Sequence, residues 1–155
     1  MIDAGDMAPD FTLPAAGADA ETVTLSELRG APVVLFFYPK DDTPGCTNEA
    51  KEFSAMLDEF RDAGIRVFGI SRDPIAAHDK FRAKHDLTVP LLSDEEGGAT
   101  EAYGVWKEKS MYGKTYMGIE RSTFLIDAEG KVAKAWRKVK VPNHGMDVMG
   151  VARGL

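Results

Sequence analysis

The chain of 155 residues contains a single cysteine, Cys46. One cysteine cannot form an internal disulfide, so a hydrophobic core must hold the fold, and we expect a reducing, cytoplasmic compartment. Basic residues are also in deficit, since 19 Lys and Arg stand against 25 Asp and Glu, a net charge of -6. A negative surface repels phosphates, so neither nucleic acid nor anionic membrane is expected as a partner.

Long hydrophobic runs are missing as well. The longest, residues 31–38, falls far short of the ~20 residues that cross a membrane. No basic segment followed by an apolar stretch opens the sequence, so we expect no secretory signal. Repeats and Pro/Gly/Ser-rich linkers are also lacking, and hydrophobic residues make up 44% of the chain. This composition and length predict a single globular domain over residues 1–155.

The apolar pattern predicts an α/β fold. Continuous β-branched and aromatic runs at 32–38 and 66–71 are typical of central strands covered on both faces. Helical periodicity covers 46–63, and a second helix is predicted over 74–84. A hairpin follows, with strands 122–127 and 131–136. This order favours a thioredoxin-like architecture, a mixed central sheet with helices on both faces.

Other segments carry weaker patterns. Short stretches beside prolines suit edge strands, and glycine closes one helical turn. The predictions are edge strands at 8–14 and 89–93, a helical turn at 24–30, a short helix at 98–103, a loop-like segment over 103–116 and a terminal helix after residue 142.

Residues 38–46 join the first central strand to the amphipathic helix, where open α/β sheets bind ligands. Thr43 followed by Pro44 fits an N-cap and a first helical residue. Cys46 would then be the third helical residue, with its backbone N–H meeting the Thr43 hydroxyl and its sulfur at the positive end of the helix dipole, which favours a thiolate. A buried structural cysteine and a simple cap remain the alternative. A dithiol exchange site is excluded, because Thr43 occupies the position of the first thiol in Cys-x-x-Cys.

Residues 37–50 read Phe-Tyr-Pro-Lys-Asp-Asp-Thr-Pro-Gly-Cys-Thr-Asn-Glu-Ala. This segment strongly resembles the active-site segment of the peroxiredoxins, and within them the peroxiredoxin Q or bacterioferritin comigratory protein group. Pro39, Thr43 and Cys46 match the pattern Pro-x-x-x-Thr-x-x-Cys. A second match over 112–127 carries Arg121 at the position of the family's active-site arginine. Weaker similarity covers nearly the whole chain.

The resemblance implies a thiol-dependent peroxidase that needs no metal or cofactor. The Cys46 thiolate attacks a hydroperoxide and becomes a sulfenic acid, releasing water or an alcohol. Arg121 stabilises the thiolate and the leaving oxygen. Thr43 orients the peroxide, and Pro39 shapes the pocket and limits water. Glu49 is predicted to complement the positive helix end rather than to take part in catalysis.

Lys51 marks a departure from the group. Many peroxiredoxin Q sequences carry a resolving cysteine five residues after the nucleophile, where this chain has Lys51, either naturally or by engineering. The resemblance therefore implies a one-cysteine form, a monomer or weak dimer, whose sulfenic acid is reduced by an external thiol. Thioredoxin, glutaredoxin and glutathione all remain open. The alternative is a non-enzymatic peroxide sensor or redox-linked chaperone that uses the same cysteine.

Two histidines are further candidates for metal ligands. His78 and His85 share a face of the predicted helix two turns apart, but no carboxylates accompany them at metal-ligand spacing. We therefore expect no metal site.

Overall fold

The computed structural model describes residues 2–155, which fold around a seven-stranded mixed sheet with strand order β2-β1-β5-β4-β3-β8-β9. At its centre β3 (Val33–Phe37) runs parallel to β4 (Arg66–Ser71) and antiparallel to β8 (Ser122–Ile126). All five residues of β3 are buried, as expected for a strand covered on both faces. The predicted mixed sheet is confirmed.

The outer strands differ from the prediction. β1 (Thr12–Ala16) begins later than expected and is not an edge, because β2 (Thr22–Thr24) pairs along its outer side. β5 (Leu91–Ser93) is also internal, lying between β1 and β4. Prolines suggested edges here. Pro90 precedes β5 and so removes no ladder hydrogen bond, whereas Pro14 lies in the middle of β1, opposite Thr22 of β2. β9 (Val132–Trp136) completes the predicted hairpin with β8.

The long helix predicted over 46–63 is two helices. α1 (Pro44–Ala55) and α2 (Leu57–Asp62) meet at Met56, whose ψ of 0° departs from helical values. Phe53 and Phe60, on either side of this junction, are both fully buried. The other helices are close to prediction: η1 (Leu25–Leu28), α3 (Ile75–His85), α4 (Gly98–Ala102) and α5 (His144–Ala152). Among residues 2–155, none of the helices combines the length and hydrophobicity needed to cross a bilayer.

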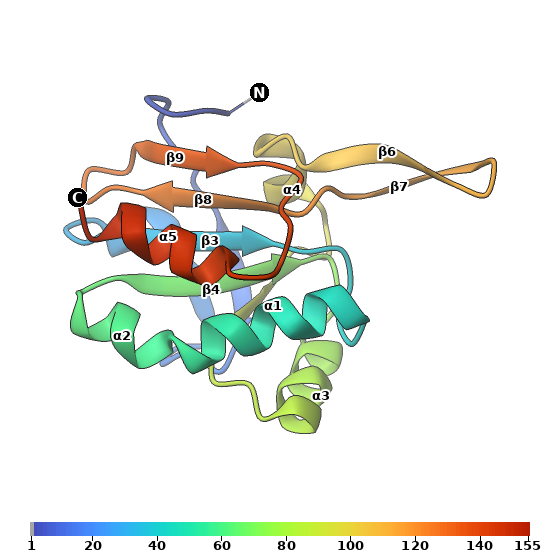
Figure 1. The fold of residues 1–155 in the computed structure, drawn as a ribbon, viewed down its shortest axis with the longest axis horizontal. Helices are drawn as coiled ribbons and strands as arrows, with labels where there is room; N and C mark the ends of the chain where they lie inside the picture. Colours follow the sequence, from blue (N-terminus) through green and yellow to red (C-terminus); the bar gives the residue numbers. More distant parts are fainter. Residues whose placement is uncertain (1) are drawn as a thin grey trace.

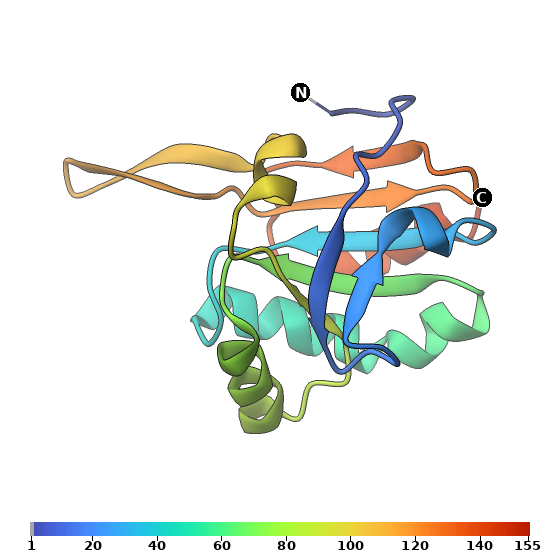
Figure 2. The ribbon, with the colours of Figure 1, turned by 180° about the vertical axis from the view of Figure 1, so that it is seen from behind.

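Two hydrophobic layers cover the sheet. α1, α2 and α5 lie on one face, where Val34 and Phe36 of β3 point (Figure 1). The β1–β2 hairpin lies across the opposite face, which buries Val33, Leu35 and Phe37 (Figure 2). α3 contributes Phe81 to the first layer, and Tyr103 at the end of α4 belongs to the second. Side chains of β3 therefore alternate between two cores.

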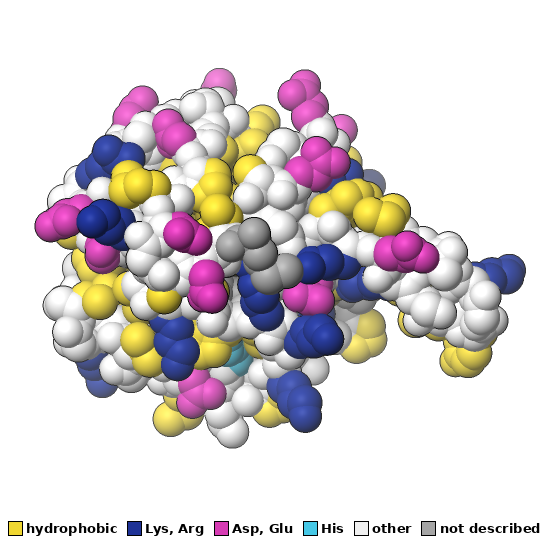
Figure 3. All heavy atoms as spheres, turned by 90° about the horizontal axis from the view of Figure 1, so that it is seen from above, with side chains coloured by type: hydrophobic (Ala, Val, Ile, Leu, Met, Phe, Trp, Pro, Cys, Tyr) yellow, Lys and Arg dark blue, Asp and Glu magenta, His cyan; other side chains and the backbone are white. Residues whose placement is uncertain are grey.

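A hairpin occupies most of the segment, 103–116, that was predicted to be loop-like. β6 (Trp106–Met111) and β7 (Lys114–Ile119) pair in antiparallel register and project from the body (Figure 3). Tyr112 and Gly113 both have positive φ, 52° and 77°, as a two-residue type I′ turn requires. Tyrosine is an unusual residue at such a turn, so the sequence carried no clear signal for it. The arm exposes large apolar side chains: Met111, Tyr112, Tyr116 and Met117.

Candidate active site

Cys46 lies at the start of α1, beyond the C-terminal end of β3. Pro44 is the first helical residue, so Cys46 is the third, as predicted, and only 2% of it is exposed. Thr43 holds the N-cap position, but its predicted hydrogen bond to the Cys46 backbone is wrong. The Thr43 hydroxyl instead donates to the carbonyl of Lys40 at 2.8 Å, because the tight loop before the helix brings that acceptor close.

Arg121 reaches Cys46 from a distant part of the chain. It directly precedes β8, and Ser122 of β8 pairs with Phe37, the last residue of β3. This register brings the arginine beside the loop that follows β3. Its Nη2 donates to Sγ of Cys46 at 3.2 Å. A Cβ on Gly45 would lie 3.2 Å from the same nitrogen, so glycine there leaves room for the guanidinium.

Glu49 is linked to Cys46 through Arg121, which donates a hydrogen bond to each of them. Nη1 of Arg121 donates to Oε1 of Glu49 at 2.7 Å, and the glutamate is 1% exposed. Its second oxygen, Oε2, is buried without a hydrogen-bond partner among the described residues. Burial raises the pKa of Glu49 to about 7, and the charge of Arg121 offsets this rise only in part. One turn after Cys46, Glu49 therefore faces the arginine, whereas the sequence suggested only a role at the helix end.

Arg121 is correspondingly the charged centre of the site. Burial alone would lower its pKa, but the charges of Glu49 and Cys46 raise the pKa of Arg121 above its usual value. The guanidinium therefore stays cationic and joins the two groups.

The raised pKa of Glu49 predicts a pH dependence of stability. The pKa of Glu49 is about 7 in the folded protein, against an ordinary value of 4.5, so folding favours the protonated form between these two pH values. The free energy of unfolding should therefore fall as pH rises through this window, by about 3 kcal/mol from this residue. Glu49→Gln keeps an oxygen for Arg121 and removes the titration, so its profile should lack that fall. Denaturant unfolding at successive pH values measures it.

The control for this prediction is Glu96→Gln, which neutralises an exposed carboxylate. Its stability profile should follow that of the wild type. Parallel profiles for the wild type and Glu49→Gln would contradict the assignment of the buried titration to Glu49.

The four predicted site residues share one end of the sheet. The structure brings Cys46 and Arg121 into contact. Thr43 and Pro39, both partly buried, lie in the loop between β3 and α1. Within residues 2–155 no three His, Cys, Asp or Glu side chains are grouped as metal ligands.

Lys109 is a further site residue that the sequence did not reveal. It lies on β6, opposite Tyr116, and is partly buried. Burial lowers its pKa, and the charge of Arg121 lowers it further, while Cys46 and Glu120 act in the opposite direction. A second cation therefore lies near enough to Arg121 and Cys46 for their charges to shift its pKa. Finding it required the β6–β7 hairpin, which the sequence had suggested to be a loop.

Comparison with known proteins identifies the family. The AhpC/TSA family model matches residues 4–135, so the chain belongs to the AhpC/TSA family, whose members include the peroxiredoxins. Peroxiredoxin Bcp of Bacillus subtilis is 50% identical over 143 residues, covering 92% of this chain and 90% of the relative. Peroxiredoxin Bcp of Escherichia coli K12 is 46% identical over the same shares.

The solved structures that resemble this chain belong to the same family as its sequence relatives. Peroxiredoxin Q of Xanthomonas campestris superposes with a TM-score of 0.89 at 44% identity, covering 97% of both chains. A Xylella fastidiosa PrxQ mutant gives 0.92 at 39% identity, covering 99% of this chain and 97% of the other. The thioredoxin-like fold is confirmed. Within its family the chain falls in the Bcp or peroxiredoxin Q group, and it is a thiol-dependent peroxidase that uses a hydroperoxide and a thiol reductant.

Proposed function

We propose that Cys46 is the peroxidatic residue and that it reduces hydrogen peroxide and organic hydroperoxides. The thiolate sulfur bonds to the terminal peroxide oxygen, the O–O bond breaks, and the leaving oxygen takes a proton to become water or an alcohol. Cys46 is left as a sulfenic acid. The observation that carries the proposal is the 3.2 Å contact between Arg121 Nη2 and Sγ, which sets a permanent cation beside the sulfur.

The neighbouring residues have distinct proposed roles. Arg121 stabilises the thiolate and then the charge that builds on the leaving oxygen. Because the Thr43 hydroxyl donates its proton to Lys40, its oxygen lone pairs are free to accept the peroxide O–H and so orient the substrate. Pro39, in the loop that follows β3, limits the access of water to the sulfur.

We further propose that an external thiol regenerates Cys46. The chain has one cysteine, so no second thiol within it can resolve the sulfenic acid. The incoming thiol attacks the sulfenic sulfur and releases water, and a second thiol reduces the mixed disulfide. Thioredoxin, glutaredoxin and glutathione are the candidate reductants. The free thiol supports a cytoplasmic location, and we propose a monomer or weak dimer.

The choice of substrate draws support from a relative. A structure of the Xanthomonas campestris bacterioferritin comigratory protein, 44% identical to this chain, is described in terms of alkyl peroxide reduction. That description supports including alkyl hydroperoxides among the substrates proposed here.

A peroxide-consumption assay tests the function and identifies the reductant. Its three arms contain thioredoxin with its reductase, glutaredoxin with glutathione, and no reductant. We expect many turnovers per Cys46 in at least one of the first two arms, and in the third no peroxide consumption beyond the oxidation of Cys46 itself. One stoichiometric oxidation in every arm would instead favour a peroxide sensor.

Without reductant, oxidation is expected to stop first at the sulfenic acid and then to proceed further. No second thiol is present in the chain to trap this species as an internal disulfide. Intact mass spectrometry should show one added oxygen at equimolar peroxide and two or three at excess peroxide. A dominant dimer linked through Cys46 would contradict this course.

A further inference from the structure

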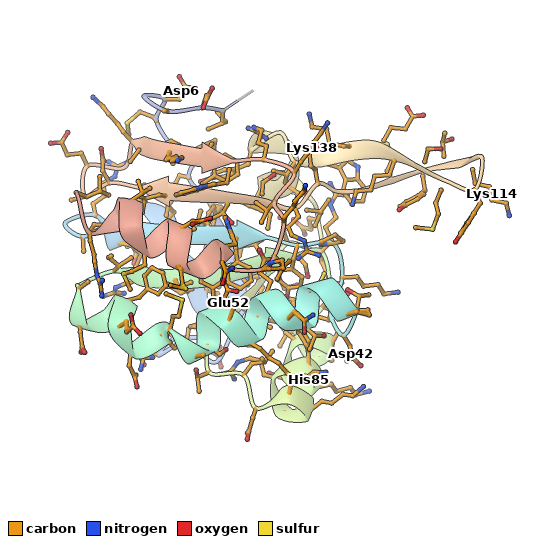
Figure 4. All side chains as sticks on the ribbon, viewed as in Figure 1. Asp6, Asp42, Glu52, His85, Lys114 and Lys138 are labelled. Carbon is orange, nitrogen blue, oxygen red and sulfur yellow. The ribbon has the colours of Figure 1, made fainter. Side chains whose placement is uncertain are left out.

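The loop that leads into α1 is attached to α3 at two consecutive aspartates. Asp41 Oδ2 lies 2.7 Å from Nδ1 of His78. Asp42 Oδ1 lies 2.7 Å from Nε2 of His85, and its other oxygen accepts from Lys84 at 2.6 Å. Figure 4 shows Asp42 beside His85 on α3. The two histidines, two turns apart on one helix face, therefore hold adjacent residues of the loop.

The two attachments differ in burial. The side chain of His78 is 0% exposed and that of Asp41 6%, whereas Asp42 is 42% and Lys84 62% exposed. Exposed ion pairs contribute little to stability, because water and salt screen the attraction between the charges. Breaking a buried hydrogen-bonded pair leaves one polar group without a partner, which costs far more stability. The Asp41–His78 pair is therefore the attachment expected to determine the position of the loop.

Every polar group of this pair has a partner. Nε2 of His78 lies 2.9 Å from the carbonyl of Leu92, which can only accept, so this nitrogen carries a proton. The hydroxyl of Tyr38 donates to Oδ1 of Asp41 at 2.6 Å. Burial and the charge of Asp41 raise the pKa of Tyr38, so this hydroxyl keeps its proton. The backbone N–H of Asp41 donates to Asp73 at 2.9 Å.

This network connects the loop to the reacting sulfur. Asp41 is two residues before Thr43 and five before Cys46, so its attachment sets where α1 begins. Arg121 comes from a different element, just before β8. The 3.2 Å contact between Cys46 and Arg121 therefore depends on how firmly the loop is held. The same hold keeps Cys46 2% exposed, which suits a small peroxide but restricts a larger external thiol.

We propose that His78 is a positioning residue for the reaction. By binding Asp41 it holds residues 38–44 and the first turn of α1 in the closed arrangement in which Cys46 meets Arg121 and reacts with peroxide. Releasing this hold slows the peroxide step and leaves reduction of the sulfenic acid unchanged or faster. The inference rests on the proposed role of Cys46.

Three variants separate positioning from general stability. His78→Gln can donate to the Leu92 carbonyl, in place of Nε2, but does not reach Asp41. His78→Asn places its amide nitrogen about where Nδ1 stands, so it can still donate to Asp41. His85→Gln changes the same residue type on the same helix, at the exposed attachment, and serves as the matched control.

Double-mixing stopped flow measures the two half-reactions. The first mixing gives the second-order rate constant for oxidation of Cys46 by hydrogen peroxide. The second gives the rate constant for reduction of the newly formed sulfenic acid by dithiothreitol and by thioredoxin. Thermal unfolding confirms that each variant is folded at the assay temperature.

We expect His78→Gln to lower the peroxide rate constant at least about fivefold, with no fall in the reduction rate constant. His78→Asn should stay within about threefold and His85→Gln within about twofold of the wild type. Three outcomes would overturn the proposal. They are a fall of less than about fivefold in the peroxide rate constant of His78→Gln, a fall in His78→Asn as large as that in His78→Gln, and a parallel fall of both rate constants in His78→Gln. A purely structural role would give the parallel fall.

A second variant covers the case in which His78→Gln does not fold. Tyr38→Phe removes only the hydroxyl that donates to Asp41, and should slow the peroxide step about threefold with no fall in reduction. An unchanged peroxide step, or slowing of both steps, would overturn the proposal. Failure of the wild type to oxidise Cys46 would instead contradict the proposed function, so the two failures are distinguishable.

Discussion

Cys46→Ser is expected to abolish turnover of peroxide, with a loss of at least about a thousandfold in the presence of a supplied thiol. A serine hydroxyl ionises far less readily than a thiol and is a poor nucleophile at neutral pH. The variant should still fold, because serine is similar in size and its oxygen can accept the hydrogen bond from Arg121 that Sγ accepts in the wild type. Peroxide consumption measures the loss, and circular dichroism with thermal unfolding checks the fold.

The matched control for this prediction is Lys51→Ser, which introduces the same residue at an exposed position of the same helix. Its turnover should stay within about twofold of the wild type. Substantial turnover by a folded Cys46→Ser protein would refute the assignment of Cys46 as the nucleophile.

Arg121→Lys is expected to lower the second-order rate constant for peroxide about ten- to a hundredfold. The two terminal nitrogens of Arg121 serve two acceptors, Sγ of Cys46 at 3.2 Å and Oε1 of Glu49 at 2.7 Å. Lysine has one terminal nitrogen, which cannot reproduce this planar arrangement. Such a loss corresponds to about 1.4–3 kcal/mol of transition-state stabilisation. Stopped-flow oxidation of Cys46 under single-turnover conditions measures it.

The same exchange at an exposed site, Arg61→Lys, is the control and should leave the rate unchanged. If Arg121→Lys reacts with peroxide at the wild-type rate, Arg121 is not the residue that stabilises the reacting charge.

The failed structural predictions have specific physical causes. The hydroxyl oxygen of Thr43 was expected to accept a hydrogen bond from the backbone of α1, but the hydroxyl points to the Lys40 carbonyl, to which it donates, and makes no cap hydrogen bond. The helical pattern over 46–63 continues through Met56 without a break, because a bend does not change the spacing of Phe53 and Phe60. The arm formed by β6 and β7 lacks regular alternation and turns at a tyrosine, so its pattern did not predict strands.

The amino-acid sequence by itself determined the central strands and the start of α1. Continuous apolar residues specify a strand buried on both faces, and Thr43 followed by Pro44 specifies where a helix begins, because both signals act between near neighbours. Only the tertiary structure decided which distant side chains meet. Arg121 and Cys46 are 75 residues apart, and His78 and Asp41 are 37 apart. Such contacts depend on strand register and on the packing of α3 against the sheet, which no local periodicity encodes.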